Sequence, residues 1–427
     1  MRLRCLRVCA RPLLAALVVG AACTPRSPAR VGVTSAANGR PYVVLVSLDA
    51  FRHDFIERYR PASLERLASR GIAARALIPP FPSKTFPSHY TIATGLYPGQ
   101  HGILSNTFYD PAIGRWFRVK DSTTVRDGRW YGGTPIWVAA EREGVRTSVY
   151  FWPGSESAVQ GVRPSAWRNY RASLPDSVRV DESVAQLRLP PERRPHLVML
   201  YLTNVDDTTH RHGPESPRTA VAVAAIDRAL ARLLDGLARL PFGDSVNVVV
   251  VSDHGIRESP AERVLPLRSM LAAAGIDTTR VQMGDNGPVM SLWFGGDSVL
   301  ARRTLGALDA RLTHARAYAR GATPARWHMD GNVRGGEVVV VAEPGYVVVK
   351  SAGDRVLDRG NHGWDSDDPM MHGMFVAAGP QVRASGAIPA FESVHVYPFL
   401  AALLRLERAP RGDGDPAVLA PHLRAGR

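Results

Sequence analysis

Short, continuous apolar runs recur along the chain and alternate with segments of helical periodicity. Runs that are apolar on both faces are typical of strands buried in a parallel sheet. Segments 62–71 and 217–240, and another that begins near Ser88, have the apolar spacing of helices. Strands alternating with helices predict an α/β fold, a doubly wound and mostly parallel sheet with helices on both faces. The predicted strands are residues 42–50, 146–152, 196–202, 245–252 and 372–380.

This pattern loosens between about residues 258 and 355, where turn-rich stretches surround the short strand-like segments 336–343 and 345–350. We interpret this stretch as a smaller subdomain inserted into a catalytic domain of residues 41–408. Residues 409–427 are expected to form a surface tail.

Residues 1–22 have the organisation of a signal peptide. Arginines precede the apolar run LLAALVVGAA, which is too short to span a bilayer and ends in small residues before Cys23. Residues 23–40 are rich in Pro, Arg, Ser, Ala and Gly, so we expect a flexible linker there. The other cysteines, Cys5 and Cys9, also lie in the leader, so no internal disulfide is expected in the mature chain.

Export leaves two alternatives for the mature protein. The sequence GAAC resembles a bacterial lipoprotein cleavage box in which Cys23 would be lipidated, although Gly20 stands where a larger aliphatic residue is usual. We therefore expect either a lipid-anchored periplasmic protein, attached to a membrane through Cys23, or a periplasmic or secreted protein without an anchor.

The formal charge of +14 raises the question of a nucleic-acid partner. Lys84, Lys120 and Lys350 are the three lysines of the chain, so nearly all of the positive charge is arginine. These arginines are scattered, and they form no basic runs interleaved with aromatic residues. We expect a composition-biased surface and no nucleic-acid partner.

Three acidic residues follow apolar runs, namely Asp49, Asp206 and Asp253. In an open α/β sheet, side chains that follow parallel strands meet at one edge, where ligands bind. One aspartate in such a place is commonly a helix cap or a turn former. Three of them, accompanied by His210 and His254, predict a site.

The ligand types in this set favour zinc. Asp206 and His210 have a spacing that lets both face one ion, and the adjacent pair Asp253 and His254 can serve a second ion. His362 lies in the glycine-rich segment GNHGWD. Thr85, in FPSKTFPSHY, lies where a helix can begin, so backbone N–H groups there could meet a phosphate oxygen, and a metal ion could bind the Thr85 hydroxyl as an alkoxide.

The size of the catalytic task also favours metal ions. Hydrolysis of unactivated phosphate esters needs an acceleration of ~10¹⁷-fold or more. One general acid or base supplies about 10²–10⁴-fold. Two cations that bind both the attacking and the leaving oxygen close this gap better than acid–base chemistry alone.

Long motifs in the chain resemble those of a known family. They occur in the same order as in the nucleotide pyrophosphatase/phosphodiesterases of the alkaline phosphatase superfamily, and the resemblance covers most of residues 40–400. The motifs are FPSKTFPSHYTIATGLYPGQHGILSNTFYDP, YFWPGSES, YLTNVDDTTHRHGP, VVVVSDHG and GNHGWD.

The resemblance implies an alkaline phosphatase-like fold, two zinc ions, and hydrolysis of phosphodiester or pyrophosphate bonds in a small molecule, expected to be a nucleotide. It implies that Thr85 attacks phosphorus and that the phosphothreonine is then hydrolysed. One zinc ion would be held by Asp206, His210 and His362, and the other by Asp49, Asp253 and His254 beside Thr85.

The resemblance also implies roles in substrate binding. Asn106 would bind a non-bridging phosphate oxygen together with the backbone N–H of Phe86. Phe86 and Tyr201 match positions that flank the nucleobase, although both could equally be core residues. Asn361 departs from the pattern, because many relatives have aspartate beside the ligand histidine.

Alternatives remain within and outside this superfamily. A phosphomonoesterase would carry a Lys-x-Arg pair near WPGSES, and none is present. A sulfatase would need a Cys-x-Pro-x-Arg sequence, which is also missing. A phospholipid head-group phosphodiesterase would use the same metal set. An inactive nucleotide-binding envelope protein is the alternative from a different class, although every expected ligand and Thr85 are present.

The lipid-anchor alternative predicts that the wild-type protein partitions into the membrane fraction and that Cys23→Ala does not, because the acyl chains are attached through that thiol. Fractionation of cells that express each protein measures this. Equal solubility of the two proteins would remove the anchor.

Overall fold

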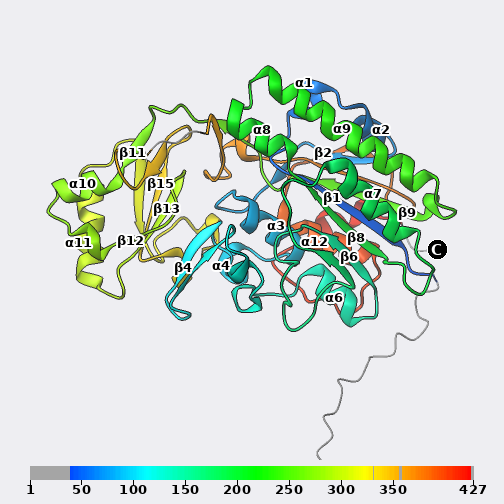
Figure 1. The fold of residues 1–427 in the computed structure, drawn as a ribbon, viewed down its shortest axis with the longest axis horizontal. Helices are drawn as coiled ribbons and strands as arrows, with labels where there is room; N and C mark the ends of the chain where they lie inside the picture. Colours follow the sequence, from blue (N-terminus) through cyan, green and yellow to red (C-terminus); the bar gives the residue numbers. More distant parts are fainter. Residues whose placement is uncertain (1–38, 330, 355–357, 425–427) are drawn as a thin grey trace, which may run out of the picture. The chain divides into compact units, whose positions relative to one another are not determined.

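A parallel sheet forms because its central strand is apolar on both faces. β1 (Tyr42–Leu48) lies between β8 (Leu197–Leu202) and β9 (Val246–Val251) and is parallel to both. The computed structural model describes residues 39–329, 331–354 and 358–424, so the predicted leader and nearly all of the predicted linker lie outside the described residues. The sheet has eight strands in the order β19-β2-β18-β9-β1-β8-β6-β7 (Figure 1).

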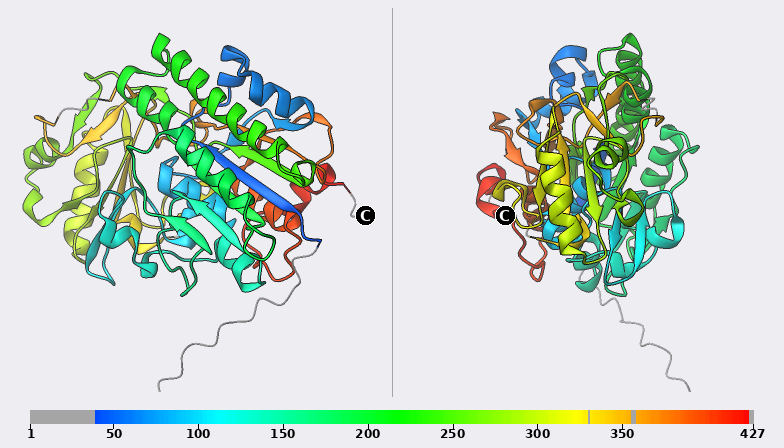
Figure 2. Two further views of the ribbon diagram at one scale, coloured as in Figure 1. Left: turned by 45° about the vertical axis from the view of Figure 1, so that its right-hand side comes forward. Right: turned by 90° about the vertical axis from the view of Figure 1, so that its left-hand side faces the viewer.

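Helices cover both faces of this sheet, as predicted. Val43 and Leu45 of β1 pack in the same core cluster as residues of α3 (Thr85–Thr94), α6 (Ile136–Arg142) and α12 (Val396–Leu403). Val44 and Val46 pack on the other face, with α2 (Ala62–Ser69), α7 (Asp176–Leu187) and α9 (Pro217–Ala238). Alternate residues of one strand therefore pack against opposite helical layers. Figure 2 shows the ribbon from two further directions, with helices on both sides of the sheet.

One edge of the sheet departs from the expected pattern. Gly71, expected to end a helix, instead begins the strand β2 (Gly71–Ala74). Its neighbour β18 (Phe375–Ala378) runs antiparallel to both β2 and β9. A Cβ atom at Gly71 would lie 1.9 Å from the carbonyl oxygen of Ala377, so the approach of these two strands requires glycine.

A second sheet forms between residues 282 and 342, within the span predicted as an insert. This sheet is antiparallel and has the order β12-β13-β15-β14. α10 (Leu267–Ala273) and α11 (Ser298–Asp309) pack in its core cluster. Val339 and Val341 face the other way and contact Phe81 and Leu104 of the catalytic part. Its strands are Gln282–Met283, Val289–Trp293, Val338–Ala342 and Ala315–Ala319.

A partly buried arginine fastens this sheet to the part of the chain that contains the eight-stranded sheet. Arg334 donates to the carboxylate of Asp110 at 2.7 Å and to the carbonyl oxygens of Gly102 and Trp130 at 2.9 and 2.7 Å. Asp110 ends β4 (Thr107–Asp110), which pairs with β5 (Arg115–Arg118) just after Asn106. The inserted sheet is thus tied to a candidate substrate-binding loop.

The remaining elements are short, apart from α8, which carries candidate ligands. The predicted tail, as far as it is described, packs on the fold, since Asp413 accepts a hydrogen bond from the N–H of Tyr97 at 2.9 Å.

The other helices are α1 (Phe55–Tyr59), α4 (Pro98–His101), α5 (Ser122–Val125) and α8 (Asn204–His212). The other strands are β3 (Leu77–Ile78), β6 (Thr147–Tyr150), β7 (Ala166–Arg168), β10 (Arg257–Glu258), β11 (Val264–Pro266), β16 (Val347–Val349), β17 (Gly360–Asn361), β19 (Gly386–Ile388) and β20 (Phe391–Glu392).

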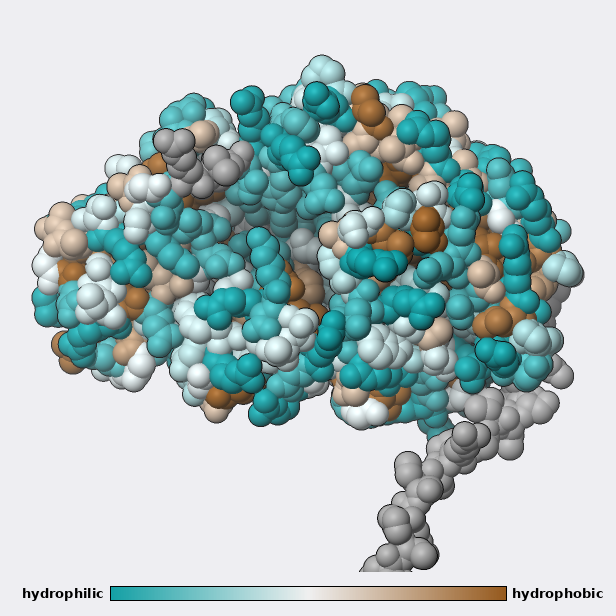
Figure 3. Space-filling model, viewed as in Figure 1, coloured by the Kyte–Doolittle hydropathy of each residue, from teal (hydrophilic) through white to brown (hydrophobic). Residues whose placement is uncertain are grey.

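The face drawn in Figure 3 is mostly hydrophilic, with hydrophobic residues in small, separate groups. Over residues 39–424, leaving aside those not described, no helix has both the length and the apolar character needed to cross a bilayer.

The contact at Gly71 gives a prediction about stability. Gly71→Ala should lower the free energy of unfolding by about 1–3 kcal/mol, because the added methyl group overlaps a strand that cannot retreat. Gly306→Ala is the matched control: no atom lies within 4 Å of its added Cβ, and alanine should stabilise helix α11 by about 0.5–1 kcal/mol. Urea denaturation measures both, and equal stability of the two variants would contradict the close packing of β2 on β18.

Candidate active site

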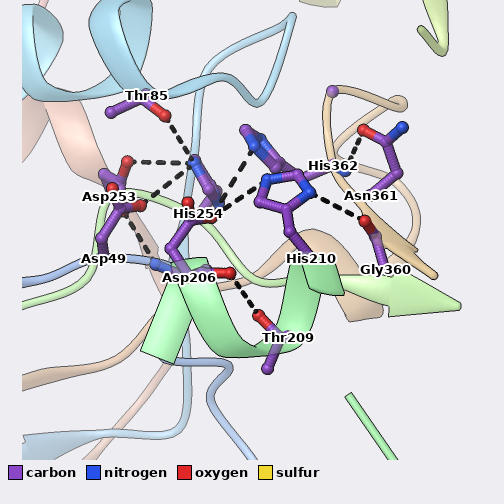
Figure 4. Close-up of polar contacts among 12 residues, drawn as sticks. Asp49, Thr85, Asp206, Thr209, His210, Asp253, His254, Gly360, Asn361 and His362 are labelled. Carbon is purple, nitrogen blue, oxygen red and sulfur yellow. Dashed lines mark hydrogen bonds and ion pairs between the residues drawn. The ribbon is translucent and has the colours of Figure 1, made fainter. Parts of the chain in front are cut away.

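The candidate ligands come from the carboxyl ends of three adjacent parallel strands. Asp49 directly follows β1, and Asp253 lies two residues after β9. α8 begins two residues after β8 and carries Asp206 and His210 one turn apart. Figure 4 shows these side chains converging with His254 and His362. The structure therefore brings together the ligand residues expected from the sequence.

The three histidines present the same ring atom to the centre of this cluster. In each ring, Nδ1 donates to a backbone carbonyl: His210 to Gly360 at 2.8 Å, His254 to Gly255 at 2.9 Å and His362 to Ser83 at 2.9 Å. This contact places the ring proton on Nδ1, so the lone pair of each ring lies on Nε2, which faces the cluster. Backbone carbonyls orient metal-binding histidines in this way.

Each of the three carboxylates has an oxygen atom that is buried without a hydrogen bond. These atoms are Asp49 Oδ1, Asp206 Oδ1 and Asp253 Oδ2. Asp206 Oδ1 lies 3.3 Å from Nε2 of His210 and 3.9 Å from Nε2 of His362, while Asp49 Oδ1 lies 3.5 Å from Nε2 of His254. Buried carboxylate oxygens are expensive without a partner, so this arrangement fits cations.

The ligand atoms form two overlapping groups of the size that a metal ion needs. One group contains Asp206, His210 and His362. The second group contains Asp49, Asp206 and His254, so Asp206 is common to both. The resemblance implied Asp253 in the second set. In the structure, Asp253 Oδ2 lies 3.0 Å from Nε2 of His254, next to that group.

The buried acidic and basic groups of the cluster shift one another's pKa values. Burial raises the pKa of Asp49 well above its usual value, and the charges of Asp206 and Asp253 raise it further. Burial alone would lower the pKa of His210, but the negative charge of Asp206 beside it raises it to about 9. Burial, together with His254 and His210, lowers the pKa of His362. The charges of Asp206 and Asp253 therefore oppose ionisation of Asp49, and a divalent cation would relieve that repulsion.

Thr85 lies at the first residue of α3, beside this cluster. Its hydroxyl donates to Nε2 of His254 at 3.4 Å. One turn later, Nδ1 of His89 donates to the carbonyl oxygen of Thr85 at 2.9 Å and lies 3.1 Å from Oδ2 of Asp253. His89 thereby connects the start of the helix to Asp253.

Asn106 and Phe86 are brought together, as the resemblance implied. In the structure the amide oxygen of Asn106 accepts from the backbone N–H of Phe86 at 3.0 Å, and this leaves the NH₂ group of Asn106 as the donor for a substrate. The ring of Phe86 is partly exposed and packs at 5.8 Å from that of Phe117.

Tyr201 lies deeper than a residue flanking a nucleobase would. It is only 7% exposed, and its hydroxyl donates to Asp49. Tyr201 therefore helps to orient Asp49, a candidate metal ligand. Tyr170, which sequence analysis missed, is 45% exposed, and its ring centroid lies 6.3 Å from that of Tyr201. Its one signal in the sequence is an aromatic residue in the otherwise polar segment RNYRAS.

Lys84 is a second residue that sequence analysis left without a role. It directly precedes Thr85 and is 8% exposed. Burial lowers the pKa of Lys84, and Asp285 opposes that shift. The alkyl chain of Lys84 runs past Gly363, where an added Cβ would lie 3.0 Å away. A cation is therefore held next to the candidate nucleophile, in a chain with few lysines.

Sequence comparisons identify relatives of the chain. A family model described as type I phosphodiesterase / nucleotide pyrophosphatase matches residues 43–365. Venom phosphodiesterase 2 of Crotalus adamanteus is 31% identical over 375 residues, which cover 86% of this chain and 46% of that protein. An uncharacterized pyrophosphatase/phosphodiesterase of Schizosaccharomyces pombe is 32% identical, and 78% of it is covered. The chain thus spans about half the length of the venom enzyme.

Structural comparison gives the same result. Murine ectonucleotide pyrophosphatase/phosphodiesterase 5 superposes with a TM-score of 0.84 at 28% identity, covering 90% of this chain and all of the other. A second structure of that murine protein, an inactive threonine-to-alanine variant in complex with AMP, superposes with the same TM-score at 27% identity.

The shared position of Asp206 gives a prediction about metal binding. Asp206→Asn should weaken binding of a divalent metal by at least ~100-fold, because it removes a charged oxygen from both groups, and loss of an outer-shell partner alone costs 10–100-fold. Asp207→Asn is the matched control, since this neighbouring carboxylate is exposed and bonds Thr203. Elemental analysis and calorimetric titration of the purified proteins measure the effect. Equal metal content in the two variants would contradict the site.

Proposed function

The chain belongs to the type I phosphodiesterase / nucleotide pyrophosphatase family, and from this premise we propose that it hydrolyses phosphodiester or pyrophosphate bonds of nucleotides with two zinc ions and a phosphothreonine intermediate. The observation that carries the proposal is the convergence of three buried carboxylate oxygens and three Nε2 atoms beside the hydroxyl of Thr85.

Zinc suits this set of ligands better than harder cations. Mg²⁺ and Ca²⁺ prefer sites made of oxygen atoms, whereas mixed imidazole and carboxylate ligation with an open position is typical of catalytic zinc. Asp206, His210 and His362 would hold one ion. Asp49, Asp253 and His254 would hold the other next to Thr85, with Asp206 near both.

Two zinc ions, when bound, would lower the pKa of a coordinated hydroxyl and stabilise charge on the attacking and leaving oxygens. Thr85 Oγ1 loses its proton to solvent and forms a bond to phosphorus, and the bond from phosphorus to the leaving oxygen breaks, with its electron pair going to that oxygen. Water then loses a proton and forms a bond to phosphorus, and the bond to Thr85 Oγ1 breaks, with its electron pair and a proton going to Oγ1. Asn106 donates to a non-bridging oxygen and keeps the phosphorus in line.

A nucleotide is the proposed substrate class for two reasons. The murine relative of known structure holds AMP. In this chain, Phe86 and Tyr170 place partly exposed aromatic rings near the candidate site, and aromatic faces stack on nucleobases. We assign the outer base-flanking role to Tyr170, while Tyr201 supports Asp49.

The sequence around residues 152–157 disfavours a phosphomonoesterase. The additional negative charge of a monoester needs a cation, and this segment supplies the carboxylate of Glu156. A phospholipid head-group diester remains an alternative because its phosphorus chemistry is the same. Export to the periplasm or the exterior, with or without an anchor at Cys23, stays part of the proposal.

Thr85→Ala tests the covalent step. It should reduce turnover of p-nitrophenyl thymidine monophosphate by at least ~10³-fold while leaving the zinc content unchanged, because it removes the nucleophile and no ligand atom of the carboxylate and histidine cluster. Thr85→Ser should retain measurable activity. Assays of both variants at saturating zinc, with metal content measured on the same samples, provide the check.

Equal rates for the wild type and Thr85→Ala would contradict the phosphothreonine intermediate. A higher kcat/KM on p-nitrophenyl phosphate than on the thymidine diester would replace the diesterase with a monoesterase. A full complement of zinc without turnover of nucleotide diesters, head-group diesters or monoesters would favour an inactive binding protein.

A further inference from the structure

The segment that carries Tyr170 is held from both sides by buried charged groups. It connects β7 to α7 and has few apolar residues of its own. An exposed ring on such a segment would ordinarily be mobile, because little buried apolar surface fixes its backbone. The position of Tyr170 therefore depends on polar contacts that the segment makes with its neighbours.

Arg179, on α7, provides most of these contacts. Its guanidinium is 1% exposed and donates from Nε to Leu174 O at 3.0 Å, and from Nη2 to Arg171 O at 3.2 Å and Ala172 O at 3.4 Å. Nη1 donates to Tyr201 O at 3.1 Å, at the end of β8. One planar group thus fixes the Tyr170 segment relative to a strand of the catalytic sheet.

The same guanidinium also contacts aromatic rings. Its carbon lies 4.9 Å from the ring centroid of Phe151 and 5.7 Å from that of Tyr170. Phe151 has a φ of 66°, a backbone conformation that costs a bulky residue free energy and persists only when surrounding contacts enforce it. The rings of Phe151 and Tyr170 meet edge to face at 5.7 Å.

Glu156, in the motif YFWPGSES, holds the other side of the segment. Its carboxylate accepts the backbone N–H of Tyr170 at 2.8 Å and the Nε–H of Arg126 at 3.1 Å. The side chain of Glu156 is 10% exposed, so this contact is sheltered from water. The motif, which carries no cation for a monoester, has a different use here.

We propose that Arg179 and Glu156 are positioning residues that fix Tyr170 as a stacking face for the base of the substrate, and that they thereby determine selectivity for nucleoside esters over esters without a base. This inference rests on the proposed function. It assigns no contact between either charged group and the reacting atoms. Their effect reaches the substrate through the backbone of residues 170–174.

Two esters with the same leaving group separate this role from a general structural one. p-Nitrophenyl thymidine monophosphate carries a base, and methyl p-nitrophenyl phosphate does not. Tyr170→Ala should lower kcat/KM about ten-fold for the thymidine ester, mainly through KM, because one base-stacking face is lost, and much less for the methyl ester. Arg179→Lys should reproduce this selective loss, because lysine keeps the charge and loses the planar fork.

Glu156 supplies an independent variant should Arg179→Lys fail to fold. Glu156→Ala should show the selective loss, and Glu156→Gln should restore much of it, because the amide oxygen can still accept the N–H of Tyr170. Arg188→Lys, at an exposed position just after the same helix, is the matched control and should leave both esters unchanged.

Several outcomes would overturn the proposal. Equal losses on both esters in Arg179→Lys and Glu156→Ala would show a general structural role. A selective loss in Tyr170→Ala that neither Arg179→Lys nor Glu156→Ala reproduces would show that the ring needs no such support. An unchanged kcat/KM of Tyr170→Ala for the thymidine ester would show that Tyr170 is not a stacking face. Failure of the wild type, loaded with zinc, to hydrolyse either ester would instead reject the proposed function.

Discussion

Burial of three carboxylates in one cluster is the constraint on which this structure depends. Each of Asp49, Asp206 and Asp253 keeps one carboxylate oxygen away from water and without a hydrogen bond. An unpaired buried charge is destabilising by several kcal/mol, so such a set persists only where something else neutralises it. The neighbouring histidines direct Nε2 lone pairs at the same space. Both features have one explanation in common, which is cation binding.

The fold places the ligand residues at the carboxyl edge of the parallel strands. β1, β8 and β9 are parallel neighbours, so the residues that follow them converge without long loops. His362 returns to the same edge from a distant part of the chain, after the inserted sheet. Arg334 ties that inserted sheet to Asp110 and to the loop after His101, close to Asn106. The second sheet therefore contacts the region around Asn106 and precedes the segment that carries His362.

Sequence patterns predicted the parts of this arrangement that follow from periodicity. Buried parallel strands are apolar throughout, so Asp49 and Asp253 stood out as the first charged residues after each run. Side-chain direction within such a run cannot be read from it, because no polar face marks the alternation. The resemblance assigned Tyr201 to the base, and the apolar run could not show that its hydroxyl points at Asp49. Tyr170 was missed because it lies in a polar segment, outside every apolar run. Asp206 belongs to both ligand groups, and the guanidinium of Arg179 links the Tyr170 segment to β8. Both features depend on distances of a few ångströms, which the sequence does not give.

Anomalous diffraction at the zinc absorption edge, from crystals of the zinc-loaded protein, tests the central claim most directly. The account predicts two peaks, one among Asp206, His210 and His362 and the other among Asp49, Asp253 and His254, within reach of Thr85 Oγ1. Protein dissolved from the same crystals should hydrolyse diesters, which serves as the control. If it does so, a single peak, or peaks elsewhere on the protein, would contradict the account.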